Sequence, residues 1–216
     1  MNDYYILSGL KVSSFVEEQI SLYKNARWIG VDRGAHLLIQ QGIQPYLAIG
    51  DFDSVSLEEK QTVEKYSRKM IELPADKNYT DTEEAVLAVL RENRKANVYL
   101  LNESKSRLDH FISILWLPVK EEFRAYAEQI YFFDSHNKVS YYLPGDHRIK
   151  KEENKSVISF GNLLPIKELT LTGFEYPLTQ EDISAPTMYT SNKFLNEEGS
   201  FSFDQGLLMV IQSADN

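Results

Sequence analysis

The chain has 216 residues, and Asp and Glu outnumber Lys and Arg by 32 to 23, which gives a net charge of −9. This excess of negative charge argues against a nucleic-acid partner, because affinity for nucleic acid comes largely from Lys and Arg contacts to phosphate. The chain has no cysteine, which excludes disulfides, cysteine-based zinc sites, iron–sulfur clusters and a thiol nucleophile.

The first seven residues lack the basic stretch and the apolar run of a signal peptide. No run of about 18 apolar residues occurs that would span a membrane. We therefore expect a cytoplasmic protein that has no membrane partner.

Short apolar runs alternate with longer amphipathic stretches up to about residue 135. The expected strands are 4–7, 28–31, 46–49, 70–73, 98–101 and 130–133. The expected helices are 15–24, 35–41, 57–67, 82–94 and 108–123. Alternation of this kind predicts an α/β domain with a mostly parallel sheet. Such sheets bind ligands at the carboxyl ends of their strands.

The helical period disappears after about residue 138, and short apolar runs separated by turn signals take its place. The expected strands are 139–143, 156–160, 168–172, 201–203 and 207–212. Turns are expected at 144–146 and 161–162, and a solvated turn at the mixed-charge run 150–153. The pattern predicts an all-β sandwich C-terminal domain at 138–216, following the α/β N-terminal domain with a mostly parallel sheet at 1–137.

The usual phosphate-binding motifs are absent, but charged loops follow several expected strands. Gly50 ends the run 46–49, and Asp51 and Asp53 come directly after it. If this segment is extended, the two carboxylates project to the same side, as Mg²⁺ coordination requires. The alternative is a local Asx-type turn in which Ser54 caps the next helix.

A second charged loop, at 74–81, follows the run 70–73 and precedes the clearest amphipathic helix. Thr80 or Asp81 is a good N-cap for this helix, with a glutamate three residues later completing a capping box. Capping leaves Lys77 unexplained. A lysine beside metal-binding carboxylates would contact a metal-bound polyphosphate.

A third loop carries Arg107 and Asp109 after the run 98–101. Arg107 can hold phosphate oxygens, and Asp109 can orient it or accept a proton. The alternative is a surface loop in which Asp109 is the N-cap of a helix. Asp32, after the run 28–31, is a fourth contributor, because loops at the carboxyl edge of an open sheet converge on one crevice.

Electrostatic repulsion indicates what such a crevice needs in order to accept a polyphosphate. A carboxylate about 4 Å from a phosphate charge is repelled by about 4 kcal/mol at an effective dielectric constant near 20. Several carboxylates facing a polyphosphate therefore require a divalent metal. Asp51, Asp53 and Asp81, with Lys77 and Arg107, predict metal-assisted phosphoryl-type transfer.

Six short segments together resemble the thiamine pyrophosphokinase family. They read Asp32-Arg33-Gly34-Ala35, Gly42-Ile43-Gln44-Pro45, Ile49-Gly50-Asp51-Phe52-Asp53-Ser54, Lys77-Asn78-Tyr79-Thr80-Asp81, Arg107-Leu108-Asp109-His110 and Thr190-Ser191-Asn192. The resemblance implies an α/β catalytic domain, a β-sandwich domain, and a homodimer with thiamine bound between subunits. It also implies a Mg²⁺-dependent transfer of the pyrophosphoryl group of ATP to the hydroxyl of thiamine, which yields thiamine diphosphate and AMP.

The resemblance assigns roles to individual residues of this chain. The metal and the polyphosphate would be held by Asp51, Asp53 and Asp81, and the phosphates would also contact Lys77 and Arg107. The same site would be lined by Asp32 and Asp109, and the cofactor-binding motif would include Asn78 and Thr80. The thiamine side would be formed by Ser191 and Asn192. The general base stays open between Asp109 and an oxygen held by the metal.

Two positions depart from the family's pattern. The family usually has Asp where this chain has Asn78. In the family a glycine-rich segment precedes the Arg107 motif, whereas the corresponding segment 102–106 of this chain has no glycine. Lys105 in that segment would supply a side-chain contact instead. The alternatives are therefore another Mg²⁺-dependent phosphotransferase or phosphohydrolase, and a thiamine- or nucleotide-binding protein without turnover.

Overall fold

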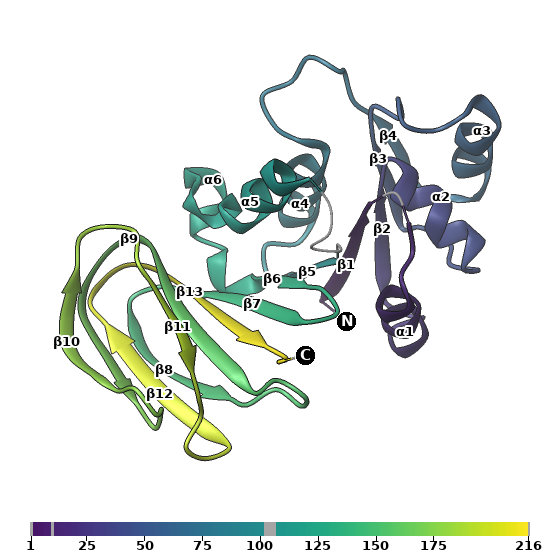
Figure 1. Ribbon diagram of the computed structural model, residues 1–216. Coiled ribbons are helices and arrows are strands. Elements are labelled where there is room, and N and C mark those ends of the chain that lie inside the picture. Colours follow the sequence, from purple (N-terminus) through teal and green to yellow (C-terminus); the bar gives the residue numbers. More distant parts are fainter. Residues whose placement is uncertain (1, 10, 102–106, 216) are drawn as a thin grey trace. The chain divides into compact units, whose positions relative to one another are not determined.

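The computed structural model in Figure 1 describes residues 2–9, 11–101 and 107–215. The chain forms two compact units, Met1–Leu117 and Pro118–Asn216. Within the described ranges, no helix has both the length and the apolar character needed to cross a membrane.

Five parallel strands form the sheet of the N-terminal unit, in the order β4-β3-β2-β1-β5. Their bounds are β1 (Asp3–Ser8), β2 (Arg27–Val31), β3 (Leu47–Gly50), β4 (Met70–Glu72) and β5 (Asn97–Leu101). Parallel neighbours need crossover connections, and helices supply them here. The predicted α/β domain with a mostly parallel sheet is confirmed.

Helices cover both faces of this sheet (Figure 1). Their bounds are α1 (Ser14–Leu22), α2 (Arg33–Gln40), α3 (Leu57–Tyr66), α4 (Asp81–Glu92) and α5 (Leu108–Leu115). On one face, Tyr5 and Leu7 of β1 belong to the same apolar cluster as Val16 of α1 and Leu38 of α2. Helix α4 packs on the opposite face, against β1, β2 and β3.

The predicted helix at 108–123 is wrong, because α5 ends at Leu115. A 3₁₀ turn, η1 (Leu117–Val119), and the short helix α6 (Glu121–Arg124) follow it. Pro118 accounts for the break, since proline has no backbone N–H and its ring clashes with the preceding turn of a helix.

Over the described residues of the C-terminal unit, eight antiparallel strands form a sandwich. They are β6 (Ile130–Phe133), β7 (Asn137–Tyr142), β8 (Gly145–Lys150), β9 (Val157–Thr172), β10 (Leu178–Ile183), β11 (Met188–Asn192), β12 (Glu198–Phe203) and β13 (Gln205–Ser213). One layer has the order β6-β7-β13-β9-β11, and the other has the order β8-β12-β9-β10. Phe160, Leu171, Phe201 and Val210 lie in the core between the layers. The predicted all-β sandwich is confirmed.

Strand β9 belongs to both layers and replaces two expected strands, 156–160 and 168–172. The expected turn at 161–162 is wrong, because the strand continues through it. Gly161 leaves room for Met188 of β11, whose Cε would lie 2.5 Å from a Cβ at this position. The side chain of Asn162 accepts a hydrogen bond from the Thr187 amide at 2.7 Å and donates one to the Leu164 carbonyl at 3.3 Å.

Three strands of the sandwich, β8, β10 and β11, were not expected from the sequence pattern. Strand β8 covers most of the segment expected to be a turn at 144–146, and it ends at Lys150, inside the charge run expected to be solvated. Its outward side chains are charged, so it lacks the apolar run by which the other strands were identified. It is held by full backbone pairing with β12.

The two compact units divide after Leu117, which is earlier than the change of hydrophobic period that placed the domain boundary at 137–138. Strand β6 ends before that change, yet it pairs antiparallel with β7, through Phe132 opposite Val139. The apolar period of β6 resembles that of the parallel strands, so the period alone does not identify its partner.

A glycine in β2 sets how closely α2 approaches the sheet. A Cβ at Gly30 would lie 2.1 Å from the Cα of Ala35, which is backbone of α2 and has no room to move. We expect Gly30→Ala to lower the free energy of unfolding by at least about 2 kcal/mol, as overpacking against backbone does. Chemical denaturation measures this loss.

The control is Gly42→Ala, at a position with φ +73° and open space around it. Alanine there costs only its left-handed backbone conformation, about 1 kcal/mol. A loss at Gly42 equal to that at Gly30 would contradict the close approach of α2.

Candidate active site

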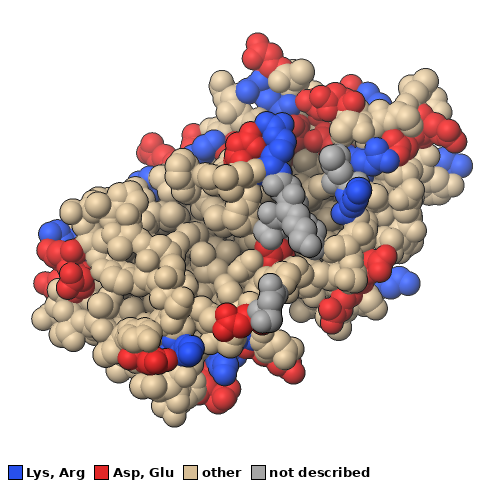
Figure 2. Space-filling model, in the orientation of Figure 1, with Lys and Arg blue, Asp and Glu red and all other residues tan. Residues whose placement is uncertain are grey.

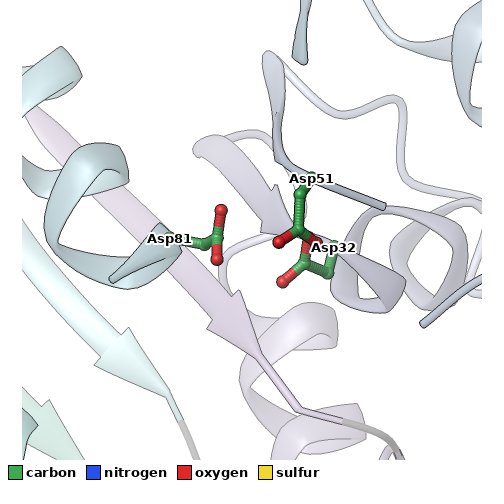
Figure 3. A group of neighbouring side chains, drawn as sticks. All are labelled: Asp32, Asp51 and Asp81. Carbon is green, nitrogen blue, oxygen red and sulfur yellow. The ribbon is translucent and has the colours of Figure 1, made fainter. Parts of the chain in front are cut away.

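Three carboxylates meet at the carboxyl edge of the parallel sheet (Figure 3). Asp32 follows β2, Asp51 follows β3, and Asp81 begins α4, which follows β4. One carboxylate oxygen of each lies within 4.8 Å of the others. Adjacent parallel strands present their ends at one edge, and in Figure 3 the three side chains point toward one another.

A strained backbone conformation holds Asp32 in place. Its φ is 49° and its ψ is −121°, and its amide donates a hydrogen bond to the Ile49 carbonyl at 3.0 Å. Its Oδ1 accepts a hydrogen bond from the Phe52 amide at 3.2 Å. A Cβ at Gly50 would lie 1.8 Å from that Oδ1, so Gly50 is required for this carboxylate to point into the site. Such strain persists only where the surrounding structure enforces it.

Of the two alternatives for the segment from Asp51 to Asp53, the extended one does not occur, because Phe52 between them has a φ of 56°. This left-handed residue ends the alternation of sides on which the expectation depended. Asp51 points into the carboxylate group, whereas Asp53 is exposed and lies outside it. Asp32 takes the place among the three carboxylates that the sequence analysis gave to Asp53.

The loop after Asp51 contains a local Asx-type turn, which was the alternative to the extended segment. The Asp53 amide donates to Oδ1 of Asp51 at 3.2 Å, which is an Asx-type turn. The cap of α3 is Ser56, with a capping box to Glu59, and not Ser54 as that alternative expected. Asp51 thus forms the turn and also faces the other acids.

Lys77 contacts two of the three carboxylates, those of Asp81 and Asp51. Its Nζ lies 3.1 Å from Oδ1 of Asp81 and 3.5 Å from Oδ2 of Asp51, and it donates to the Pro74 carbonyl at 3.0 Å. Its side chain is only 11% exposed. Burial opposes its charge, but Asp81 and Asp51 outweigh burial and raise the pKa of Lys77.

The acids differ in how strongly they bind a proton. Burial, together with the charges of Asp81 and Asp51, raises the pKa of Asp32 to about 6. Burial acts in the same direction on Asp51, but the Asp53 amide and the Lys77 ammonium hold the pKa of Asp51 below its usual value. Asp32 therefore binds a proton more strongly than Asp51 does.

The remaining residues of the 77–81 motif have separate positions. Thr80 is the N-cap of α4 and forms a capping box with Glu83, as expected. Asn78 is exposed. Capping accounts for the Thr80 hydroxyl, and it also fixes Asp81 at the first position of the helix.

Arg107 and Asp109 pair with each other at the start of α5. Nη2 of Arg107 donates to Oδ2 of Asp109 at 2.6 Å, and both side chains are more than half exposed. Arg107, not Asp109, occupies the N-cap position, so the alternative of an Asp109 cap is wrong. Asp109 lies outside the group of three carboxylates. The segment 102–106, with Lys105, lies outside the described residues.

Ser191 and Asn192 end strand β11 of the C-terminal unit. Ser191 is exposed and has a φ of 62°. Asn192 is 2% exposed, and its side chain accepts from the Tyr176 amide at 2.9 Å and donates to the Tyr176 carbonyl at 2.8 Å. Asn192 therefore holds the neighbouring loop, and Ser191 presents its hydroxyl to solvent.

Comparison with known proteins agrees with this architecture. The family model described as thiamin pyrophosphokinase, catalytic domain, matches residues 20–130, and the model described as thiamin pyrophosphokinase, vitamin B1 binding domain, matches residues 146–208. The thiamine pyrophosphokinase of Bacillus subtilis (strain 168) is 37% identical over 196 residues, which cover 87% of each chain. This chain belongs to the thiamine pyrophosphokinase family.

Solved structures of the thiamine pyrophosphokinase family have the same fold. A family protein from Enterococcus faecalis is 33% identical, with all of both chains covered and a TM-score of 0.89. The thiamin pyrophosphokinase from Geobacillus thermodenitrificans is 28% identical, with 100% of this chain and 99% of that chain covered and a TM-score of 0.80.

One cluster at the site was missed by sequence reasoning. Glu59 of α3 accepts hydrogen bonds from the Ser56 amide at 2.8 Å and from Nη2 of Arg33 at 3.0 Å, and it lies 3.7 Å from Nε2 of His36. It thus ties the loop that carries Asp51 to the first turn of α2, next to Asp32. The motif Ser-x-x-Glu at 56–59 signals the cap but not the contact with α2.

The raised pKa of Asp32 gives a prediction for this family member. In the folded protein the pKa of Asp32 is about 6, against an ordinary value of 3.8. The resulting loss of stability is absent below pH 3.8 and complete above pH 6. We expect Asp32→Asn to raise the free energy of unfolding by about 1–2 kcal/mol at pH 7.5 in metal-free buffer, and not at pH 4.

Urea denaturation at the two pH values measures this difference. Asparagine keeps an oxygen that can accept from the Phe52 amide, so the substitution removes mainly the charge. Asp53→Asn, which removes an exposed carboxylate outside the cluster, is the control and should change little. A less stable Asp32→Asn protein at pH 7.5 would contradict the burial of an uncompensated charge.

Proposed function

We propose that the protein is a thiamine pyrophosphokinase, which transfers the pyrophosphoryl group of ATP to the hydroxyl of thiamine and releases AMP. The observation that carries the proposal is the meeting of Asp32, Asp51 and Asp81 at the carboxyl edge of the sheet, with Lys77 in contact with two of them, in a chain of this family. In the reaction the hydroxyl oxygen of thiamine bonds to the β-phosphorus of ATP and loses its proton. The bond between the β-phosphorus and the oxygen that bridges it to the α-phosphorus breaks, and AMP leaves with that oxygen.

The donor set of this site fits Mg²⁺. All three side chains offer carboxylate oxygens, which are the ligands that this ion prefers. Oδ1 of Asp81 is buried and has no hydrogen-bond partner among the described residues, although the Lys77 ammonium is near it. The ammonium itself shows that the oxygens accommodate a cation. Bound there, Mg²⁺ would neutralise the charge of the polyphosphate and stabilise the transition state.

The chain's own residues would position the nucleotide. Asp51, Asp81 and Asp32 would hold the metal, with Asp53 as a further oxygen donor at the edge of the site. Lys77 and Arg107 would contact phosphates, and Asn78 and Thr80 belong to the same binding loop. Asp109, paired with Arg107, would orient it or accept the proton of the thiamine hydroxyl.

The thiamine side would lie on the C-terminal unit around Ser191, next to the loop that Asn192 holds through the Tyr176 backbone. Tyr176, Met188 and Leu195 of this region are 59%, 39% and 64% exposed. Figure 2 shows few charged side chains across the middle of the visible face of the C-terminal unit. An uncharged, partly apolar surface supports the proposal that the enzyme is a homodimer with thiamine near the subunit interface. We place this enzyme in the cytoplasm.

The reaction is tested with purified protein, ATP, thiamine and Mg²⁺, with the nucleotide products resolved. We expect AMP and thiamine diphosphate in equal amounts, and AMP release that depends on thiamine. Thiamine monophosphate, whose hydroxyl is already esterified, is the control and should release no AMP. ADP or phosphate as product would instead show another phosphotransferase or a phosphohydrolase, and binding without any product would show a sensor.

The carboxylate cluster is tested by Asp51→Asn. We expect at least a tenfold loss of turnover with the fold retained, because the substitution removes a charge that faces the metal. Asp53→Asn should lose less, since Asp53 lies outside the cluster. Asp76→Asn, an exposed acid of the loop that carries Lys77, should be close to wild type. Near-normal turnover in Asp51→Asn would show that Asp51 serves only the local turn and does not hold the metal.

A further inference from the structure

The ammonium of Lys77 occupies the place where a cation would bind the acids. Three oxygens surround its Nζ: the Pro74 carbonyl at 3.0 Å, Oδ1 of Asp81 at 3.1 Å and Oδ2 of Asp51 at 3.5 Å. Two of these belong to the carboxylates proposed to hold Mg²⁺. The side chain is largely buried, so solvent does not screen this contact fully.

A magnesium ion and this ammonium cannot use the same oxygens together. Mg²⁺ needs oxygen ligands at about 2.0–2.1 Å in near-octahedral geometry. An ammonium about 3 Å from those same oxygens would lie within a few Å of the metal and repel it strongly. Metal binding through these two oxygens therefore requires that Lys77 leave its position.

The chain around Lys77 permits such a movement. Lys77 lies between β4 and α4, in the segment 73–80, which contains no helix or strand. Its neighbours Asp76 and Asn78 are exposed, so their side chains add little packing on either side of Lys77. Lysine carries its charge on a flexible four-carbon stem with rotatable donors, which suits a cation that changes partners.

We propose that Lys77 is a displaceable counter-ion. Its ammonium neutralises the carboxylates until metal and nucleotide bind together, and it then moves to contact the phosphates. This inference rests on the proposed function. It assigns Lys77 two positions, one in the acid cluster and one on the polyphosphate. A metal ion alone must displace the ammonium without compensation, whereas a metal–nucleotide complex gives the ammonium a new partner. The free protein therefore discriminates against bare metal in favour of the complex.

The test compares metal binding in the absence and presence of nucleotide. Mn²⁺ binding to the metal-free protein at pH 8 is followed by its electron paramagnetic resonance signal or by calorimetry. We expect Lys77→Met to bind Mn²⁺ at least tenfold more tightly than wild type without nucleotide. With a non-hydrolysable ATP analogue present, the same variant should bind the nucleotide at least tenfold more weakly.

Two further variants separate displacement from general electrostatics. Lys60→Met removes one positive charge from the same unit, but Lys60 pairs with Glu72 at 2.7 Å and lies outside the acid cluster. Its Mn²⁺ affinity should stay within about twofold of wild type. Lys77→Arg keeps the charge and should not bind bare Mn²⁺ more tightly than wild type. Thermal unfolding in metal-free buffer verifies that each variant is folded.

Unchanged or weaker Mn²⁺ binding in folded Lys77→Met would overturn the inference, because the lysine would then be a fixed ion pair or a supporter of the metal. This result leaves the proposed function intact if wild type still forms AMP from ATP and thiamine. If wild type binds no Mn²⁺ and forms no AMP, both the proposed function and the inference fail.

Discussion

Repulsion among three carboxylates is the constraint on which the N-terminal unit's sheet edge depends. Charges of one sign at a separation of about 4 Å repel by about 4 kcal/mol at an effective dielectric constant near 20, so three ionised acids at this edge would oppose folding. Two features offset the repulsion. The ammonium of Lys77 contacts Asp51 and Asp81, and the pKa of Asp32 is raised to about 6, so this acid is mostly protonated below about pH 6. A fold selected only for stability would separate these acids, and their closeness is what makes the site able to hold a cation.

The backbone around the acids is strained in the same place. Asp32 and Phe52 both have positive φ although neither is glycine, and each such residue costs of order 1–3 kcal/mol. Their conformations support each other, because the Phe52 amide donates to Asp32 and Gly50 leaves the space for that carboxylate. Glu59 then ties the helix that follows Asp32 to the loop that follows Asp51. Carboxylate placement is thus a property of two loops held together, and not of either strand alone.

The sequence predicts the elements of this protein better than it predicts the geometry of the site. Hydrophobic periodicity finds the parallel strands because a buried strand leaves a clear apolar run, and it misses β8 because charged residues alternate along an exposed face. It reads β9 as two strands because Gly161 and Asn162 look like a turn, although they serve packing and a side-chain hydrogen bond. Loops at strand ends pointed to Asp51 and Asp81, and to Asp32 as a further contributor, but the predicted set of metal ligands held Asp53 in place of Asp32. The geometry of these acids was not predicted, since the left-handed conformation of Phe52 has no signature in the residue types and alone turns Asp53 away.

The net charge of −9 is a poor guide to whether this chain handles anions. Beyond about 8 Å, exposed charges are largely screened at physiological salt, so a bound polyphosphate responds mainly to the groups at the edge of the sheet. Near neutral pH those groups comprise three carboxylates and one ammonium, because Asp32 has a pKa of about 6 and is mostly ionised there. A polyphosphate alone would meet net repulsion there. A divalent ion removes this repulsion by adding two positive charges, and the ammonium stays close enough to contact phosphate. The acids therefore make anion binding conditional on the metal, and this dependence follows from the arrangement of a few side chains, whatever the charge on the rest of the surface.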